Sequence, residues 1–176
     1  MTKYLFILPV IIFAGSVSAN VLNPYGGRVL ITGNIQDNTC TVSTDSSNLS
    51  VSMGTVNSKQ LRQSGDTSLP IEFDIDLQNC GEAASGVSVT FTGTADGSGS
   101  SLLALDSAGD SATGIGVAIL DSDRTLIPIN TASKTYPLDP SQADNILPFY
   151  AQYSVTGSSV TPGSANATAT FSLTYQ

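Results

Sequence analysis

Alternation of apolar and polar residues is the feature that most restricts how this chain can fold. It is clearest over residues 69–77, where every second residue from Leu69 to Leu77 is apolar and those between are mostly charged or polar. A period of two predicts a β-strand with one buried and one solvated face. The same alternation recurs at residues 49–53, 87–91, 115–119, 147–155 and 167–175. Because Gly, Ser, Asp and Pro fill the intervening segments and no amphipathic helix is evident, we expect an all-β fold.

The number and length of these strands fit one domain. A chain of 176 residues that is 40% hydrophobic can bury a core, so disorder is not expected. The default architecture is an antiparallel β-sandwich of immunoglobulin-like size. Alternation alone does not distinguish this sandwich from a jelly roll or a barrel.

The first 19 residues have the composition of a secretory signal peptide. Lys3 precedes an apolar run over residues 4–15, and Val17-Ser18-Ala19 provides a small-residue cleavage site. A membrane anchor is the alternative, but the run is shorter than the ~20 residues that span a bilayer. Cleavage after Ala19 would leave 5 basic and 14 acidic residues, because Lys3 is one of the 6 basic ones, and hence a net charge of −9.

Composition restricts the function as well. The chain has no histidine, which excludes Ser-His-Asp and Cys-His catalysis and histidine-containing zinc sites. Its basic residues are few and scattered, so it lacks a positive surface for nucleic acid. Two acidic pairs, Asp74 with Asp76 and Asp121 with Asp123, fit a solvated strand face and a hairpin turn better than a calcium or catalytic site. We therefore expect no enzyme, no catalytic residue, no metal, no cofactor and no small-molecule substrate.

Cys40 and Cys80 are the only cysteines. In an exported protein such a pair favours one disulfide, although two buried free thiols are the alternative. A bond that closes a 40-residue loop would stabilise the fold by about 4 kcal/mol in the chain-entropy model.

The segment after the signal peptide also alternates. Val29, Ile31, Gly33 and Ile35 share one face, whereas Arg28, Thr32 and Asn34 make the opposite face polar, with Leu30 as the exception. A glycine within a strand often marks a place where another backbone comes close. Periodicity does not say whether this strand pairs within its own chain or with another one.

Three groups of residues together resemble the type 1 pilin family of chaperone-usher fimbriae. Residues 26–35 with Cys40-Thr41-Val42 are similar to the N-terminal extension and first cysteine of that family. Residues 73–80 resemble its strand that ends on the second cysteine. Residues 161–176 resemble its terminal strand, with Gly163 fourteenth from the end and Tyr175 in the penultimate position.

The resemblance implies an immunoglobulin-like β-sandwich that lacks its last strand and is completed by a donor strand from another subunit. It implies a signal peptide at residues 1–19, a donor extension at 20–37 and a pilin domain at 38–176. Val29, Ile31, Gly33 and Ile35 would be the donor residues. The acceptor groove, which also binds the chaperone, would comprise Gly163, Ala167, Ala169, Phe171, Leu173, Tyr175 and Gln176, the last through its carboxylate.

The function implied is that of a structural subunit that polymerises by donor-strand exchange and supports cell adhesion. Its partners would be other fimbrial subunits, a periplasmic chaperone and an outer-membrane usher. The protein would be exported through the periplasm to a fimbrium on the cell surface. The alternative from the residues alone is a secreted, monomeric β-sandwich that binds carbohydrate or another ligand through its loops.

Overall fold

The computed structural model describes residues 30–33, 37–97 and 101–176. The chain divides into two units, residues 1–34 and 35–176, and the second contains all the regular secondary structure described. The expected signal peptide, Val29 and Ile35 lie outside the described residues. No helix within the described ranges is long and apolar enough to cross a membrane.

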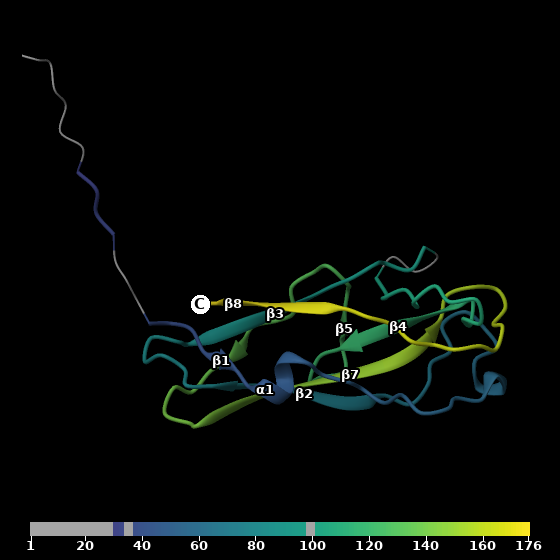
Figure 1. Cartoon of the computed structure of the whole chain (residues 1–176), viewed down its shortest axis with the longest axis horizontal. Coiled ribbons are helices and arrows are strands. Elements are labelled where there is room, and N and C mark those ends of the chain that lie inside the picture. Colours follow the sequence, from purple (N-terminus) through teal and green to yellow (C-terminus); the bar gives the residue numbers. More distant parts are fainter. Residues whose placement is uncertain (1–29, 34–36, 98–100) are drawn as a thin grey trace, which may run out of the picture. The chain divides into compact units, whose positions relative to one another are not determined.

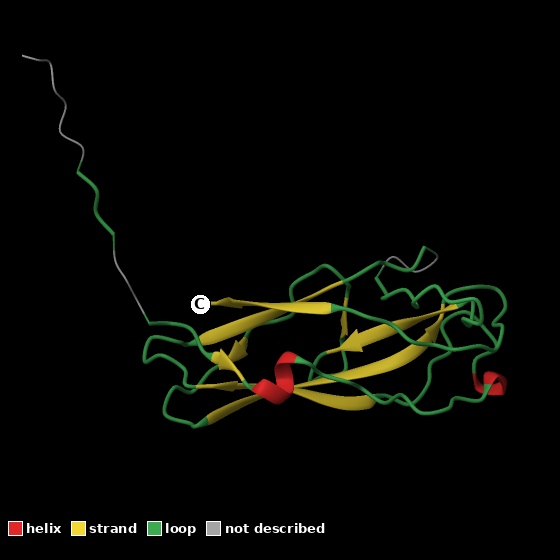
Figure 2. Cartoon of the chain, in the orientation of Figure 1, coloured by secondary structure: helices red, strands yellow, loops and turns green. Residues whose placement is uncertain are grey.

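The second unit is a β-sandwich of two antiparallel sheets (Figures 1 and 2). One sheet has the strand order β1-β2-β7-β4-β5, and the other has the order β6-β3-β8. The strands are β1 (Thr41–Val42), β2 (Ile71–Gln78), β3 (Gly86–Thr92), β4 (Ile115–Leu120), β5 (Leu126–Ile127), β6 (Tyr136–Pro137), β7 (Asp144–Val155) and β8 (Thr170–Tyr175). The helices are short: α1 (Thr44–Ser47) and the 3-10 helix η1 (Ser58–Gln60). The predicted all-β sandwich is confirmed.

The register of the strands places the apolar residues of both sheets in one core. In the larger sheet Phe73 lies opposite Phe149 and Ile75 opposite Leu147, while in the smaller one Val89 lies opposite Leu173. Successive side chains of a strand point to opposite faces of the sheet. In this register the apolar side chains of each alternating strand therefore lie on the face that points into the core. Phe149, Ile75, Leu77, Val87 and Val89 are fully buried.

An aromatic cluster joins the two sheets at the centre of this core. The ring of Phe149 stacks on Phe73 at a centroid distance of 5.7 Å and meets Phe91 and Tyr136 edge-on at 5.1 and 5.3 Å. Phe91 belongs to the smaller sheet, whereas Phe73 and Phe149 belong to the larger one. Such offset and edge-to-face contacts add to the free energy gained from apolar burial.

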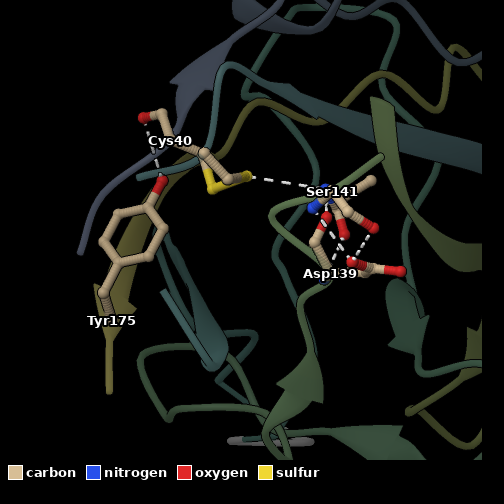
Figure 3. The surroundings of a disulfide bond; sticks show 6 residues. Cys40, Asp139, Ser141 and Tyr175 are labelled. Atoms are coloured by element: carbon tan, nitrogen blue, oxygen red, sulfur yellow. Dashed lines mark hydrogen bonds between the residues drawn. A yellow bond between two sulfur atoms is a disulfide. The ribbon is translucent and has the colours of Figure 1, made fainter. Parts of the chain in front are cut away.

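The predicted disulfide between Cys40 and Cys80 is confirmed (Figure 3). Cys40 immediately precedes β1 and Cys80 follows β2 by two residues, and Thr41 of β1 lies opposite Gln78 of β2. The bond therefore fastens the short edge strand β1, which has only two paired residues, to the long strand β2.

Two alternating stretches differ from the prediction. Residues 49–53 form no strand, and the predicted terminal strand begins at Thr170, so that Ala167 and Ala169 precede it. Within the described ranges, no backbone hydrogen bond joins residues 49–54 or 167–169 to another segment. These segments have the alternation of strands but no neighbour to pair with.

Truncation of Phe149 should destabilise the sandwich strongly, because it removes the ring on which the aromatic cluster is built. We expect Phe149→Ala to lower the free energy of unfolding by about 3–5 kcal/mol, measured by urea denaturation. Tyr150→Ala is the matched control, since Tyr150 is the next residue of β7 and is only partly buried. Equal losses in the two variants would contradict the assignment of Phe149 to the centre of the core.

Candidate functional site

A groove with an apolar floor lies between two segments that have no strand partner on their groove sides within the described residues. Residues 49–54 form one wall and residues 165–171 form the other, and the groove encloses about 520 Å³. Phe73 and Phe91 contribute to its floor, so it reaches the aromatic cluster. The remaining floor residues come from the core: Leu103, Val117, Ile119, Ala151 and Tyr153.

The C-terminal wall is held in place at its start. The buried side chain of Tyr153 donates a hydrogen bond from its hydroxyl to the carbonyl oxygen of Ala165 at 2.8 Å. A tyrosine phenol is protonated at neutral pH at its ordinary pKa, and burial raises the pKa of Tyr153 further, so its hydroxyl can donate. From the outer side, the backbone N–H of Asp106 donates to Asn166, and the Thr168 hydroxyl donates to the Asp106 carboxylate. The wall is therefore positioned without a strand partner on its groove side.

β8 continues this wall as an edge strand. It pairs with β3 along one edge and has no strand partner along the other edge within the described residues. Ala167, Ala169 and Phe171 alternate with exposed polar residues, contact the core and remain partly exposed. A free strand edge above exposed apolar side chains is a template for another strand.

The opposite wall has the same character. Val51 and Met53 pack partly against the core, Leu49 is 40% exposed, and the serines between them are exposed. Sequence alternation had indicated an ordinary strand here and gave no sign that this segment would line the groove. Its position beside the groove becomes evident only from the structure, in which residues 49–54 have no strand partner.

The groove lining contains no charged residue, although the chain has 14 acidic ones. No group of three or more His, Cys, Asp or Glu residues suited to a metal ion occurs in the described part of the chain. The chemistry that the lining offers is apolar contact together with the unpaired backbone groups of its two walls. Such a site suits an extended peptide whose alternate side chains are apolar.

The end of β8 lies beside the disulfide (Figure 3). The Tyr175 hydroxyl donates to the carbonyl oxygen of Cys40 at 3.2 Å, which links the end of β8 to the start of β1. The backbone N–H of Gln176 donates to Gly86, and a backbone oxygen of Gln176 accepts from the Ser85 hydroxyl at 3.0 Å. Leu173, Tyr175 and Gln176 therefore lie beyond the groove lining, while Ala167, Ala169 and Phe171 belong to it.

Gly163 also lies outside the lining and has a packing role in the structure. A Cβ atom at this position would overlap the carbonyl oxygen of Asp110 and the backbone nitrogen of Ala112. The next residue, Ser164, exchanges two backbone hydrogen bonds of 2.8 Å with Asp110 and Ala112. A glycine at 163 thus lets the chain approach residues 110–112 just before it forms the groove wall.

The expected donor residues are described only in part. Residues 30–33 have no regular secondary structure, and Leu30 and Ile31 are 77% and 89% exposed. A Cβ atom added to Gly33 would meet nothing within 4 Å. Val29 and Ile35, the other two expected donors, lie outside the described residues.

The two acidic pairs occupy ordinary structural positions. Asp121 is buried, and its carboxylate accepts the backbone N–H groups of Asp123 and Thr125, which shapes the turn between β4 and β5. Lys134 forms ion pairs with Asp121 and Asp123. Asp74 lies on the outer face of β2, where partial burial and the neighbouring Glu72 raise the pKa of its carboxyl group.

The sequence model of a family described as Fimbrial protein matches residues 29–176, which is most of the chain. The chain belongs to the fimbrial protein family. The fimbrial-like protein YcbV of Escherichia coli K12 is 41% identical over 151 residues, and the match covers 86% of each protein. The A chain of type-1 fimbrial protein from the same strain is 37% identical over 166 residues, covering 93% of this chain and 90% of the relative.

This fimbrial protein is also similar in structure to a chain in a solved chaperone-usher pilus. The TM-score is 0.66 at 25% sequence identity, and the match covers 90% of this chain and 100% of the other. The first relative is a fimbrial-like protein and the second is a chain of type-1 fimbrial protein, and fimbrial subunits of this kind form surface pili. The resemblance to chaperone-usher pilins that the sequence indicated is confirmed.

Substitution of Gly163 should destabilise the fimbrial sandwich at the start of the groove wall. We expect Gly163→Ala to lower the free energy of unfolding by about 1–3 kcal/mol in urea, because the new methyl group forces residues 110–112 away. Gly109→Ala is the matched control, since a Cβ atom there would meet nothing within 4 Å. If both variants were equally stable, the close approach at Gly163 would have no energetic weight.

Proposed function

We propose that this fimbrial protein polymerises by donor-strand exchange, in which residues 20–37 of one subunit fill the groove of the next. The observation that supports the proposal is the groove itself, which has an apolar floor between two alternating segments that have no strand partner on their groove sides within the described residues. One added strand would supply backbone partners for both walls and apolar side chains for the floor. Val29, Ile31 and Ile35 would enter the groove, and Gly33 would face a place too shallow for a side chain.

A transient partner is needed before polymerisation. An uncovered groove beside a free strand edge promotes aggregation, so a periplasmic chaperone would cover it until an outer-membrane usher exchanges the chaperone for the next subunit. The chaperone would lie along β8 and the segment before it, and meet the carboxylate of Gln176 with a basic group. Residues 1–19 would direct export to the periplasm and be removed, leaving the pilin domain at residues 38–176 behind the donor extension.

The role proposed is structural rather than enzymatic. The groove has no acid, base or nucleophile arranged for catalysis, and the chain has no histidine. The fimbrium would stand on the cell surface and support adhesion, with other fimbrial subunits as the lasting partners.

Substitution of Gly33 tests the donor side. We expect Gly33→Leu to abolish polymerisation of the mature chain, because the new side chain would hold the donor backbone away from the groove floor. Polymers can be counted as heat-resistant bands on a gel and as fibres by electron microscopy. Gly109→Leu is the matched control, because that glycine is also open to solvent, and it should polymerise normally. Normal assembly of Gly33→Leu would refute the donor role of residues 20–37.

A peptide tests the acceptor side. The Gly33→Leu chain, whose own extension is disabled while its groove is intact, should be stabilised by a synthetic peptide of residues 20–37. At a hundredfold excess over the dissociation constant we expect a gain of about 2.7 kcal/mol, measured as a rise in melting temperature. The same peptide carrying Gly33→Leu should have no effect.

This experiment also distinguishes the alternative function. A secreted, monomeric sandwich that binds carbohydrate through its loops would melt at high temperature without the peptide and would show no shift with it. A high melting temperature without peptide, together with no shift, would therefore favour a closed ligand-binding domain over a fimbrial subunit that needs a donor.

A further inference from the structure

We propose that a hollow on the outer face of the larger sheet, built around Arg124, binds a saccharide that carries a carboxylate group. The hollow encloses about 450 Å³, a size typical of small-ligand sites. Its lining comes from η1, from residues 67–70 before β2, from β4 and the turn that follows it, and from β7. It shares no lining residue with the apolar groove, so this inference does not rest on donor-strand exchange.

Arg124 supplies a positive charge whose position is fixed by its surroundings. Its backbone N–H donates to the carbonyl oxygen of Asp121 at 2.9 Å, which holds it in the turn between β4 and β5. Its φ of 61° is in the left-handed region that favours glycine, so the turn places an arginine where the backbone conformation is unfavourable. The guanidinium carbon lies 4.7 Å from the centroid of the Tyr150 ring. Stacking on this ring limits the conformations of the side chain, which reduces the entropy lost when a ligand binds.

The guanidinium of Arg124 has no acidic partner within the described residues. Lys134 forms the ion pairs with Asp121 and Asp123, which are the acidic residues nearest in the sequence. Glu72, on the outer face of β2, forms no ion pair with Arg124. The described lining of the hollow contains no acidic residue. The guanidinium is therefore free to pair with a carboxylate from a ligand, although the chain has 14 acidic residues.

The number of charges favours a carboxylate over a phosphate. Arg124 is the one charged residue in the described lining. A guanidinium matches a single carboxylate through two parallel hydrogen bonds. A phosphate monoester carries up to two negative charges at neutral pH, and one guanidinium on an acidic chain would not balance them. We therefore assign the hollow to a ligand with one carboxylate.

The rest of the lining suits the hydroxyl groups and the ring of a sugar. Gln60 and Gln152 each offer an amide donor and acceptor, and Thr67 offers a hydroxyl. None of these three side chains forms a hydrogen bond within the described residues. Leu69, which is 84% exposed, and Pro70 add an apolar edge that can cover the C–H face of a sugar ring.

An acidic peptide fits this hollow less well, because the strands beneath it have no free edge. β7 lies between β2 and β4, and β4 lies between β7 and β5 (Figure 1). An extended peptide that binds to a sheet usually pairs with the backbone of an edge strand. Here recognition has to come from side chains. If the chain polymerises, the hollow recurs in every subunit, so a weak single site gains strength on a saccharide-coated surface.

Equilibrium dialysis of the full mature chain against a labelled tetrasaccharide of alternating glucuronate and N-acetylglucosamine tests the proposal. It measures binding per subunit whether or not the chain has polymerised, so its failure is distinct from a failure of donor-strand exchange. We expect Arg124→Gln to weaken binding by about tenfold or more, because a charge-assisted pair is lost. Gln152→Ala should weaken binding without a change in charge. Arg62→Gln is the matched control, since it removes the same charge outside the lining, and it should bind like the wild type.

The ligand can be varied as well, which keeps the test valid even if Arg124→Gln fails to fold. The tetrasaccharide with its carboxylates reduced to alcohols should bind the wild-type chain about tenfold more weakly or worse. Equal binding of the reduced form would overturn the role of the carboxylate. No saturable binding by the wild type, or equal losses in Arg124→Gln and Arg62→Gln, would overturn the site. Polyglutamate that bound as well as the saccharide would overturn the assignment to a sugar and indicate an acidic peptide instead.

Discussion

The free edge of β8 is the constraint on which the rest of the structure depends. A β-strand at the edge of a sheet leaves every second N–H and C=O group of its backbone without a partner in the sheet. In this chain the free edge lies above an apolar floor that includes Phe73 and Phe91. An ordinary edge strand can be solvated, but this one cannot be hydrated fully without also exposing the core. Among the described residues, the sandwich thus has an unpaired strand edge beside an apolar groove floor.

Much of this arrangement could be predicted from sequence. Alternation located β2, β3, β4 and β7, and the two cysteines gave the disulfide. The strand predicted at residues 49–53 is absent, because alternation reports which face of a segment is apolar. It does not report whether a neighbouring strand is present to pair with that segment. The same limit explains why Ala167 and Ala169 precede β8 rather than belonging to it. The physical reason is that strand formation is a property of two segments, whereas alternation is a property of one.

The residues of the predicted terminal motif, 163–176, have different roles in the structure, for a similar reason. Ala167, Ala169 and Phe171 line the groove, whereas Tyr175 donates a hydrogen bond to Cys40 beyond it and Gly163 permits the close approach of residues 110–112. Sequence spacing groups all of them as one functional strip. Only contacts between segments distant in sequence, such as the hydrogen bond between Tyr175 and Cys40 across 135 residues, show where each of these residues lies in the fold.

An incomplete sandwich also has a kinetic consequence. A donor strand that filled the groove would form its backbone hydrogen bonds and bury its side chains together, so its release would require the loss of most of these contacts at once. Such a cooperative barrier makes the lifetime of the assembly, rather than an equilibrium affinity, the measure of its stability.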